Sequence, residues 1–299
     1  MSFSILLEQL FNGFQYGMLL FLMAIGVTLV FGVMRLVNLA HGSMFMVGGY
    51  LASAAAQATG SFWLAALCAL VGAAIMAAVI EILIVRPLYR RGHLDQLLAT
   101  FGVTLTLNEL IVVIWGRAPV FVSIPDILDG HTEMLGFPYP VYRLAITGVA
   151  ILAGLILMWL VAKTRFGMLV RAGADNRTMV AGLGVNVTVL YTLVFALAAL
   201  LAALAGMMSG PLIAMQPGVG DPILILTLTV VCIGGFGSLK GALVASLLVG
   251  LLDTFGRIFA PQWFGAAGNA LANMLVYVLM AAVLYYRPAG LFTTRGGHS

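Results

Sequence analysis

The segment Gly32–Ser43 places polar side chains between two apolar runs. It contains Arg35, Asn38 and His41, and His41 is followed at once by Gly42. In a bilayer such groups are costly unless they line a cavity or pair with backbone atoms. An interrupted helix on a transport pathway explains them. A simple cytoplasmic turn, with Asn38 capping the next helix and Arg35 among the headgroups, explains them too and is slightly favoured by physics alone.

A second segment, Ile233–Gly241, is dense in glycine. Gly234, Gly235 and Gly237 suit a sharp re-entrant turn or a close backbone crossing. The segment superficially resembles a phosphate-binding loop, but that pattern requires Gly-Lys followed by Ser or Thr. Here Lys240 precedes its glycine and no Ser or Thr follows. We therefore predict that this chain binds neither ATP nor another cofactor.

A third segment, Arg165–Asn186, combines basic and apolar residues at helical spacing and ends in glycines. Its apolar side chains can share one face while its charged side chains face water. It is either a solvated loop helix or a helix that docks onto a cytoplasmic partner. The residues in it that could couple such a partner to the membrane helices are Arg165, Gly167, Arg171, Asp175, Arg177 and Gly184.

Glu109, beside Asn108, is the one clearly intramembrane acid that the sequence indicates. An ionisable group at membrane depth marks either a transport or proton site or a buried structural partner. A secondary transporter that uses Glu109 as its proton site is therefore an alternative function. Such a protein would depend on the membrane potential and would need no ATPase.

The residues Gly218–Asp221 spell the Gly-x-Gly-Asp of intramembrane aspartyl proteases, which need two facing carboxylates. The only other candidate, Asp253, lies four residues before Arg257 and is expected to pair with it. Asp221 precedes Pro222, which fits the start of a helix with Asp221 as its cap. Neither His-Glu-x-x-His nor Gly-x-Ser-x-Gly occurs. We predict no catalytic site, no metal site and no enzymatic activity.

Runs of about 20 apolar residues, the length of a membrane-spanning helix, separate these segments. The chain is 63% hydrophobic and 8% charged, whereas a soluble domain is roughly a quarter charged. We predict an all-α polytopic membrane protein, one domain over residues 1–299, with about 8–9 transmembrane segments including broken or re-entrant helices. Asp221–Arg257 forms either two crossings or a re-entrant hairpin. The other predicted helices are Gly13–Val33, Gly42–Ala58, Trp63–Val85, Leu97–Trp115, Val141–Ala162, Val189–Pro211 and Leu271–Tyr286.

Lysine and arginine gather in alternate loops, which predicts a periplasmic N-terminus and a cytoplasmic C-terminus. Only Glu8 is charged before Arg35, so the first apolar run indicates a retained helix rather than a cleaved signal. A bacterial inner membrane is the expected location. Arg117, Arg143 and Arg257 fall outside. The basic residues expected inside are Arg35, Arg86, Arg90, Arg91, Lys163, Arg165, Arg171, Arg177, Lys240, Arg287 and Arg295.

On these segments the sequence resembles the branched-chain amino-acid ABC transporter permease family, in its LivH-type branch. Gly32–Tyr50 contains the specific element Asn-Leu-Ala-His-Gly, and Arg165–Asn186 matches the cytoplasmic loop of that family. Gly234–Gly241 matches its late glycine-rich motif. Arg287–Phe292 matches its C-terminal signature. The hydrophobic runs agree in spacing along nearly the whole chain.

The resemblance implies a permease subunit that translocates branched-chain amino acids. It implies a second, homologous permease, two cytoplasmic ATPase subunits that use ATP and Mg²⁺, and a periplasmic binding protein. Urea, short amides and aromatic acids are alternative substrates. Nothing indicates nucleic-acid binding. We expect Arg165–Asn186 to act as the coupling helix and the translocation pathway to be lined by Asn38, His41, Gly42, Gly234, Gly235 and Gly237.

Overall fold

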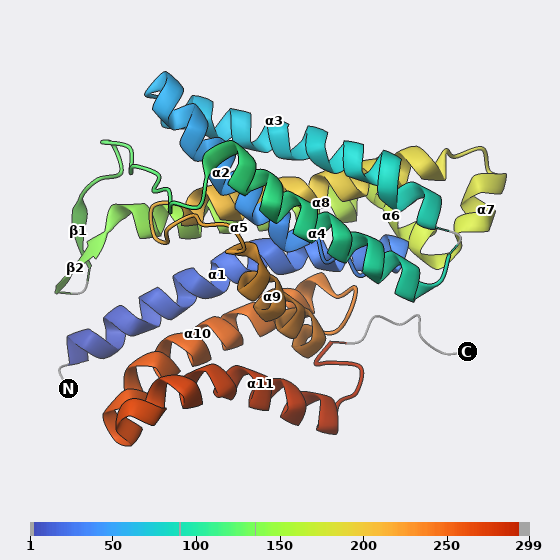
Figure 1. The fold of residues 1–299 in the computed structure, drawn as a ribbon. Helices are drawn as coiled ribbons and strands as arrows, with labels where there is room; N and C mark the ends of the chain where they lie inside the picture. The colour runs from blue at the N-terminus through green and yellow to red at the C-terminus, as the bar shows by residue number, and fades with distance from the viewer. Residues whose placement is uncertain (1–2, 90, 135, 293–299) are drawn as a thin grey trace.

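The computed structural model describes residues 3–89, 91–134 and 136–292 as a bundle of helices (Figure 1). Arg90 and Arg295, two of the basic residues expected inside, lie outside this range. The helices are α1 (Phe3–Met34), α2 (His41–Thr59), α3 (Phe62–Ile80), α4 (His93–Trp115), α5 (Val141–Lys163), α6 (Arg165–Asp175), α7 (Arg177–Gly182), α8 (Val187–Ser209), α9 (Gly220–Gly234), α10 (Leu239–Phe264) and α11 (Gly268–Tyr286).

Six helical stretches in the described ranges are long and apolar enough to cross a membrane. One of them, Leu239–Tyr286, contains two helices, α10 and α11. The predicted helical membrane fold is confirmed. A small departure is the antiparallel hairpin of β1 (His131–Met134) and β2 (Phe137–Pro140) in the loop after α4.

The helix α9 forms the first part of the stretch Asp221–Arg257, which the sequence predicts to make either two crossings or a re-entrant hairpin. It has 15 residues, which at 1.5 Å per residue span about 22 Å. A bilayer core is about 30 Å thick. The helix α9 is therefore too short to cross alone, whereas α10 has 26 residues and is long enough.

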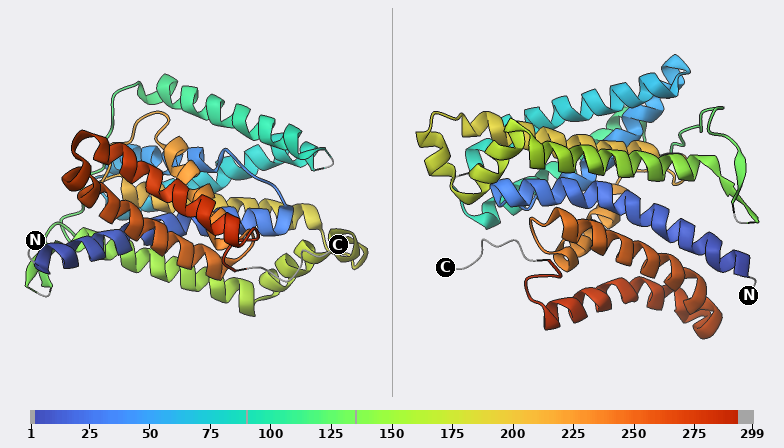
Figure 2. Two further views of the ribbon diagram at one scale, coloured as in Figure 1. Left: turned by 90° about the horizontal axis from the view of Figure 1, so that it is seen from below. Right: turned by 180° about the vertical axis from the view of Figure 1, so that it is seen from behind.

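The long helix α1 forms the centre of the bundle, and 83% of its most apolar window is buried. It packs against α5, α8, α9 and α10, and α2 packs between α3 and α8. The α6–α7 segment lies at one end of the bundle and the β1–β2 hairpin at the other (Figures 1 and 2). We call these the α6–α7 end and the hairpin end.

Glycines let short helices cross at backbone contact. A Cβ on Gly42 of α2 would lie 2.5 Å from the Gly220 carbonyl oxygen of α9. A Cβ on Gly234 of α9 would lie 2.5 Å from the Gly241 carbonyl oxygen of α10. Both crossings therefore require a residue without a side chain. In lipid, such small-residue contacts replace the hydrophobic effect in holding helices together.

We expect Gly234→Ala to lower the melting temperature of the detergent-solubilised protein, because the added methyl overpacks the crossing at a cost of about 1–3 kcal/mol. The matched control is Gly102→Ala in α4, where a Cβ meets nothing within 4 Å. Alanine has the higher helix propensity there. Differential scanning fluorimetry compares the two variants, and equal melting temperatures would contradict the crossing.

A buried carboxylate fastens the end of α3 to α8. Glu81 begins the π-helical turn Glu81–Val85 and is fully buried. It accepts hydrogen bonds from Arg86 Nη2 at 2.8 Å, Tyr89 Oη at 2.5 Å and Thr192 Oγ1 at 2.7 Å. Burial is the larger cause, and the hydrogen bond to Glu81 the next, of a raised pKa at Tyr89. The phenol of Tyr89 therefore remains a donor. The expectation that Glu109 was the one intramembrane acid is therefore wrong. Glu81 escaped notice because it falls in the last turn of the predicted third helix.

We expect Arg86→Leu to destabilise the protein by on the order of 3 kcal/mol, because it leaves a buried carboxylate uncompensated. Adding Glu81→Gln to that variant should recover part of the loss, since the charge is then gone. The control is Lys163→Leu, an exposed cation at the end of α5. Thermal unfolding in detergent measures all three. If Arg86→Leu and Lys163→Leu had the same melting temperature, the ion pair would make no contribution to stability.

Candidate functional site

The connection from α1 to α2 turns back into the bundle instead of ending at its surface. The imidazole Nε2 of His41, the first residue of α2, lies 3.2 Å from the carbonyl oxygen of Met23. Met23 is eleven residues before the end of α1 at Met34, or about 16 Å along the helix axis. The chain between Arg35 and His41 therefore runs back beside α1, and α2 begins at depth. Such an interrupted element needs protein partners for its backbone.

Two polar side chains of this break, those of Asn38 and His41, have hydrogen-bond partners inside the subunit. Asn38 is 6% exposed, and its Oδ1 accepts from the Ala40 backbone N–H at 3.0 Å. It organises the turn ahead of α2 rather than capping the helix, whose N-cap is Ala40. His41 is 1% exposed and packs against Gly26. Asn38, His41 and Gly42 thus support the break from within, and they are not among the lining residues of the three cavities described below.

The glycine-rich turn between α9 and α10 is built on backbone geometry that favours glycine. Gly235 has φ 99° and Gly237 has φ 79°, values at which a side chain is strained. Ser238 then caps α10 by accepting from the Gly241 N–H at 3.0 Å. The C-terminal segment pairs with this turn, because the Leu291 N–H bonds the Ile233 carbonyl at 2.8 Å and the Phe292 N–H bonds that of Gly234 at 3.1 Å.

The glycine turn is the second break in the chain. It lies against the last turns of α1, just before the first break. The rings of Phe31 in α1 and Phe236 in the glycine turn have centroids 4.4 Å apart. A cavity of about 110 Å³ joins Gly237 to Gly32 of α1 and to Arg171 of α6. The candidate pathway segment and the candidate coupling segment are therefore direct neighbours around Gly237.

The helix α6 is fixed tightly to the end of α5. Thr164 accepts from the Gly167 N–H at 3.2 Å and so caps α6. Gly167 sits against the Leu160 and Val161 carbonyl oxygens, where a Cβ would not fit. Arg171 donates to the Val161 carbonyl oxygen. These contacts make α6 and the end of α5 one rigid piece.

The other coupling residues lie at the two ends of α6 and at the two ends of α7. Asn176 ends α6 and caps α7 by accepting from the Met179 N–H at 3.0 Å. Gly184, with φ 83°, follows α7. Arg165 starts α6, and Asp175 ends it. All six predicted coupling residues thus belong to one helix–turn–helix segment, 165–184.

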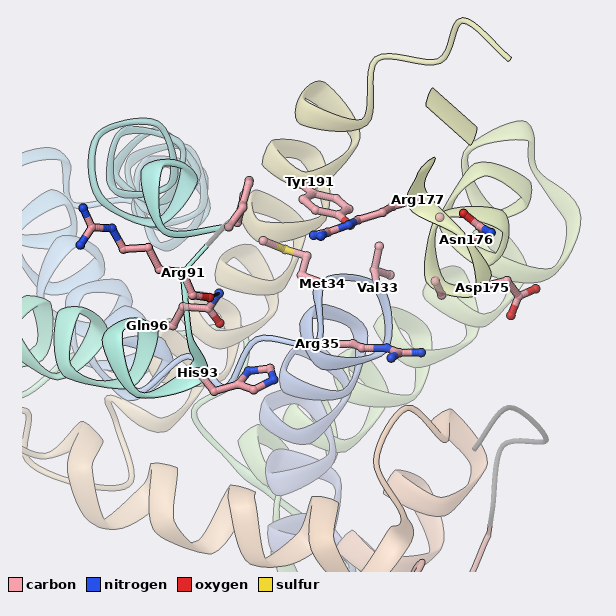
Figure 3. Close-up of a pocket in the computed structure, with 13 residues that line it drawn as sticks. Val33, Met34, Arg35, Arg91, His93, Gln96, Asp175, Asn176, Arg177 and Tyr191 are labelled. Atoms are coloured by element: carbon pink, nitrogen blue, oxygen red, sulfur yellow. Dashed lines mark hydrogen bonds between the residues drawn. The ribbon is translucent and has the colours of Figure 1, made fainter. Parts of the chain in front are cut away.

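A basic cavity of about 470 Å³ opens between this segment, the end of α1 and the start of α4 (Figure 3). Arg35 extends from α1 toward the segment, and Arg177 extends from the segment toward Tyr191 of α8 (Figure 3). Arg35 has φ 52°, an uncommon backbone conformation for a residue with a side chain. Asp175 also lines the cavity. Basic residues from three distant parts of the sequence therefore share one end of the bundle.

The surface of the segment 165–184 exposes large apolar side chains among its charges. Met168 is 59% exposed, Met179 67% and Leu183 76%. They lie at the end of the bundle where the basic residues gather, rather than on the lengths of the spanning helices (Figure 1). Their exposure beside charged residues makes this segment a candidate interaction surface.

The helix α4 carries a polar stripe that the sequence analysis missed. Gln96, Thr100, Thr104 and Asn108 recur at every fourth position and so share one face. Thr100 Oγ1 accepts from the Leu39 N–H of the α1–α2 break at 3.3 Å. The spacing of polar residues within an apolar helix is the signal in the sequence that could have revealed this polar face.

Two predictions about acids at the hairpin end need correction, and one is confirmed. Asp221 lies within the first turn of α9 and makes no capping bond, because it accepts instead from Asn108 Nδ2 at 3.3 Å. Glu109 is exposed on this chain, so it is not a buried structural partner. The expected pair of Asp253 and Arg257 forms at 2.7 Å.

Comparison with known proteins agrees with this architecture. A family model described as "Branched-chain amino acid transport system / permease component" matches residues 9–284. The high-affinity branched-chain amino acid transport system permease protein LivH of Escherichia coli is 27% identical over 305 residues, covering 97% of this chain and 96% of that protein. Its counterpart BraD of Pseudomonas aeruginosa is 29% identical over 301 residues, covering 95% of each.

A solved structure, "PsaBC from Streptococcus pneumoniae in complex with Fab", superposes with a TM-score of 0.50 at 15% identity, covering 93% of this chain and 91% of that one. At that identity the likeness concerns the fold alone. The family match and the two relatives extend over nearly the whole chain, including both breaks and the segment 165–184. This multi-pass membrane protein therefore belongs to the family of permease components of branched-chain amino acid transport systems.

Proposed function

We propose that this chain is one permease subunit of an ATP-driven importer that moves branched-chain amino acids across the bacterial inner membrane. In this proposal the α6–α7 end faces the cytoplasm and the N-terminus faces the periplasm. The partners are a second, homologous permease, two ATPase subunits that bind ATP and Mg²⁺, and a periplasmic binding protein. The whole chain acts as one permease domain. Urea, short amides and aromatic acids remain alternative substrates for a permease of this type.

The observation that supports the proposal most is the apolar surface of the segment 165–184, at the end where the basic residues gather. Positive residues flank the cytoplasmic ends of membrane helices. An ATPase subunit would bury Met168, Met179 and Leu183 and pair with the surrounding charges. A helix laid into a groove of its partner is a common recognition mode.

The contacts of α6 suggest how docking would reach the pathway. Gly167 and Arg171 join α6 to α5, so the two move together. Arg171 also shares the small cavity with Gly237, and Arg177 shares the basic cavity with Arg35. A movement of α6 imposed by closure of the ATPase dimer therefore bears on both breaks at once. This is a rigid-body switching mechanism.

We expect Met179→Glu to abolish docking of the ATPase, because it places a charge in an apolar contact. The variant should lose copurification of the ATPase subunits and at least about tenfold of substrate-stimulated ATP hydrolysis. The matched control is Ile127→Glu, which introduces the same charge in place of an apolar side chain that is 83% exposed near the hairpin end. Wild-type ATP hydrolysis by Met179→Glu in the reconstituted complex would refute the docking role.

A further inference from the structure

A polar cavity of about 360 Å³ lies toward the hairpin end, between the C-terminal half of α4 and the loop before α9. Its volume falls in the range of about 300–1,000 Å³ that is typical of small-molecule sites. It holds opposite charges and two side-chain amides beside an apolar wall. The lining residues are Asn108, Glu109, Val112, Arg117, Gln216, Pro217 and Gly218.

The walls of this cavity are fixed relative to one another. The loop after α4 and the loop before α9 exchange two backbone hydrogen bonds, both 2.8 Å long, between Val120 and Met215. Met215 is fully buried against Gly49 of α2. On the other side, Asn108 of α4 donates to Asp221 of α9 at 3.3 Å. The cavity is therefore held in shape by backbone contacts next to its lining and by the hydrogen bond from Asn108, as a preorganised site requires.

Its two charged residues have opposite signs and are not paired with each other. Glu109 and Arg117 are both exposed on the cavity side of this subunit. Among the residues that the structure describes, neither takes part in a salt bridge, whereas Arg86 and Arg257 each do. Asp221 differs from Glu109, because the Asp221 carboxylate already accepts a hydrogen bond from the Asn108 side chain. A carboxylate and a guanidinium that share a cavity without neutralising each other can receive a ligand that carries both charges.

We propose that this cavity binds the zwitterionic head of an α-amino acid during its passage. The Glu109 carboxylate accepts from the ammonium group, and the Arg117 guanidinium donates to the carboxylate, the bidentate geometry that suits arginine. Val112 and Pro217 face the apolar side chain of the ligand. The permease itself thereby selects for zwitterions, in addition to any selection by a binding protein. This inference rests on the proposed transport function and narrows its substrate class.

The test uses the complete importer, with its permease, ATPase and binding-protein partners, in liposomes that contain ATP. Uptake of radiolabelled leucine is measured for Glu109→Gln and for Arg117→Gln. The matched control is Glu133→Gln, which removes an exposed carboxylate from the nearby hairpin. We expect each cavity variant to lose leucine uptake about tenfold or more, since a hydrogen bond to a charged group is broken. The Glu133→Gln control should transport normally, and Arg117→Lys should retain part of the uptake.

Hydrolysis of ATP stimulated by the binding protein is measured on the same samples, because it reports assembly and coupling. Retained hydrolysis with lost uptake supports the site. Leucine uptake by Glu109→Gln and Arg117→Gln within twofold of the unmodified importer overturns it. Loss of hydrolysis together with uptake assigns both residues to assembly and also overturns it. An unmodified importer that moves urea but no amino acid contradicts the proposed substrate. That outcome is distinguishable from failure of the site, because it is seen with the unmodified importer and does not depend on any variant.

Discussion

The backbone cannot leave a helix inside a bilayer unless protein atoms replace the water that its polar groups would otherwise bind. Two helices of this chain, α2 and α9, begin inside the bundle. The starts of α2 and α9 meet at Gly42 and Gly220, where the absence of side chains brings the two backbones into contact. His41 reaches the Met23 carbonyl from the same place. The rest of the bundle is arranged so that these interruptions stay inside protein.

Two helices, α9 and α4, join features that lie apart in the molecule. Short helices that begin at depth have one end in the core and the other near a surface, so they transmit movement along their axes. The helix α9 runs from Gly220, beside the break, to Gly234, beside the turn that Arg171 and Phe31 approach. The helix α4 connects the basic cavity to the polar cavity, since His93 lines the first and Glu109 the second. In the proposed function, these two helices would carry a movement of the α6–α7 end toward the rest of the bundle.

Much of this fold was predictable, because apolar run length and glycine position are local signals. The predicted helices match the observed ones to within a few residues, apart from the start of α1, which lies ten residues earlier than predicted. The extent of α9 also follows from the glycines that bound it. The depth of the α1–α2 break was not predictable, since it depends on the contact of His41 with Met23, eighteen residues earlier. The network around Glu81 was hidden for a similar reason: its partner Thr192 lies 111 residues further on. Long-range pairs of this kind leave no trace in local spacing.

In the proposed function, ATP hydrolysis by partner subunits drives transport through this chain, rather than a proton moving through Glu109. The most direct test is accumulation of labelled leucine in proteoliposomes that hold the purified importer, with internal ATP kept constant and a protonophore added. We expect accumulation to require ATP and Mg²⁺ and to continue unchanged when the protonophore collapses the proton gradient. Accumulation that stops with the gradient while ATP remains, or that proceeds without ATP, would contradict it.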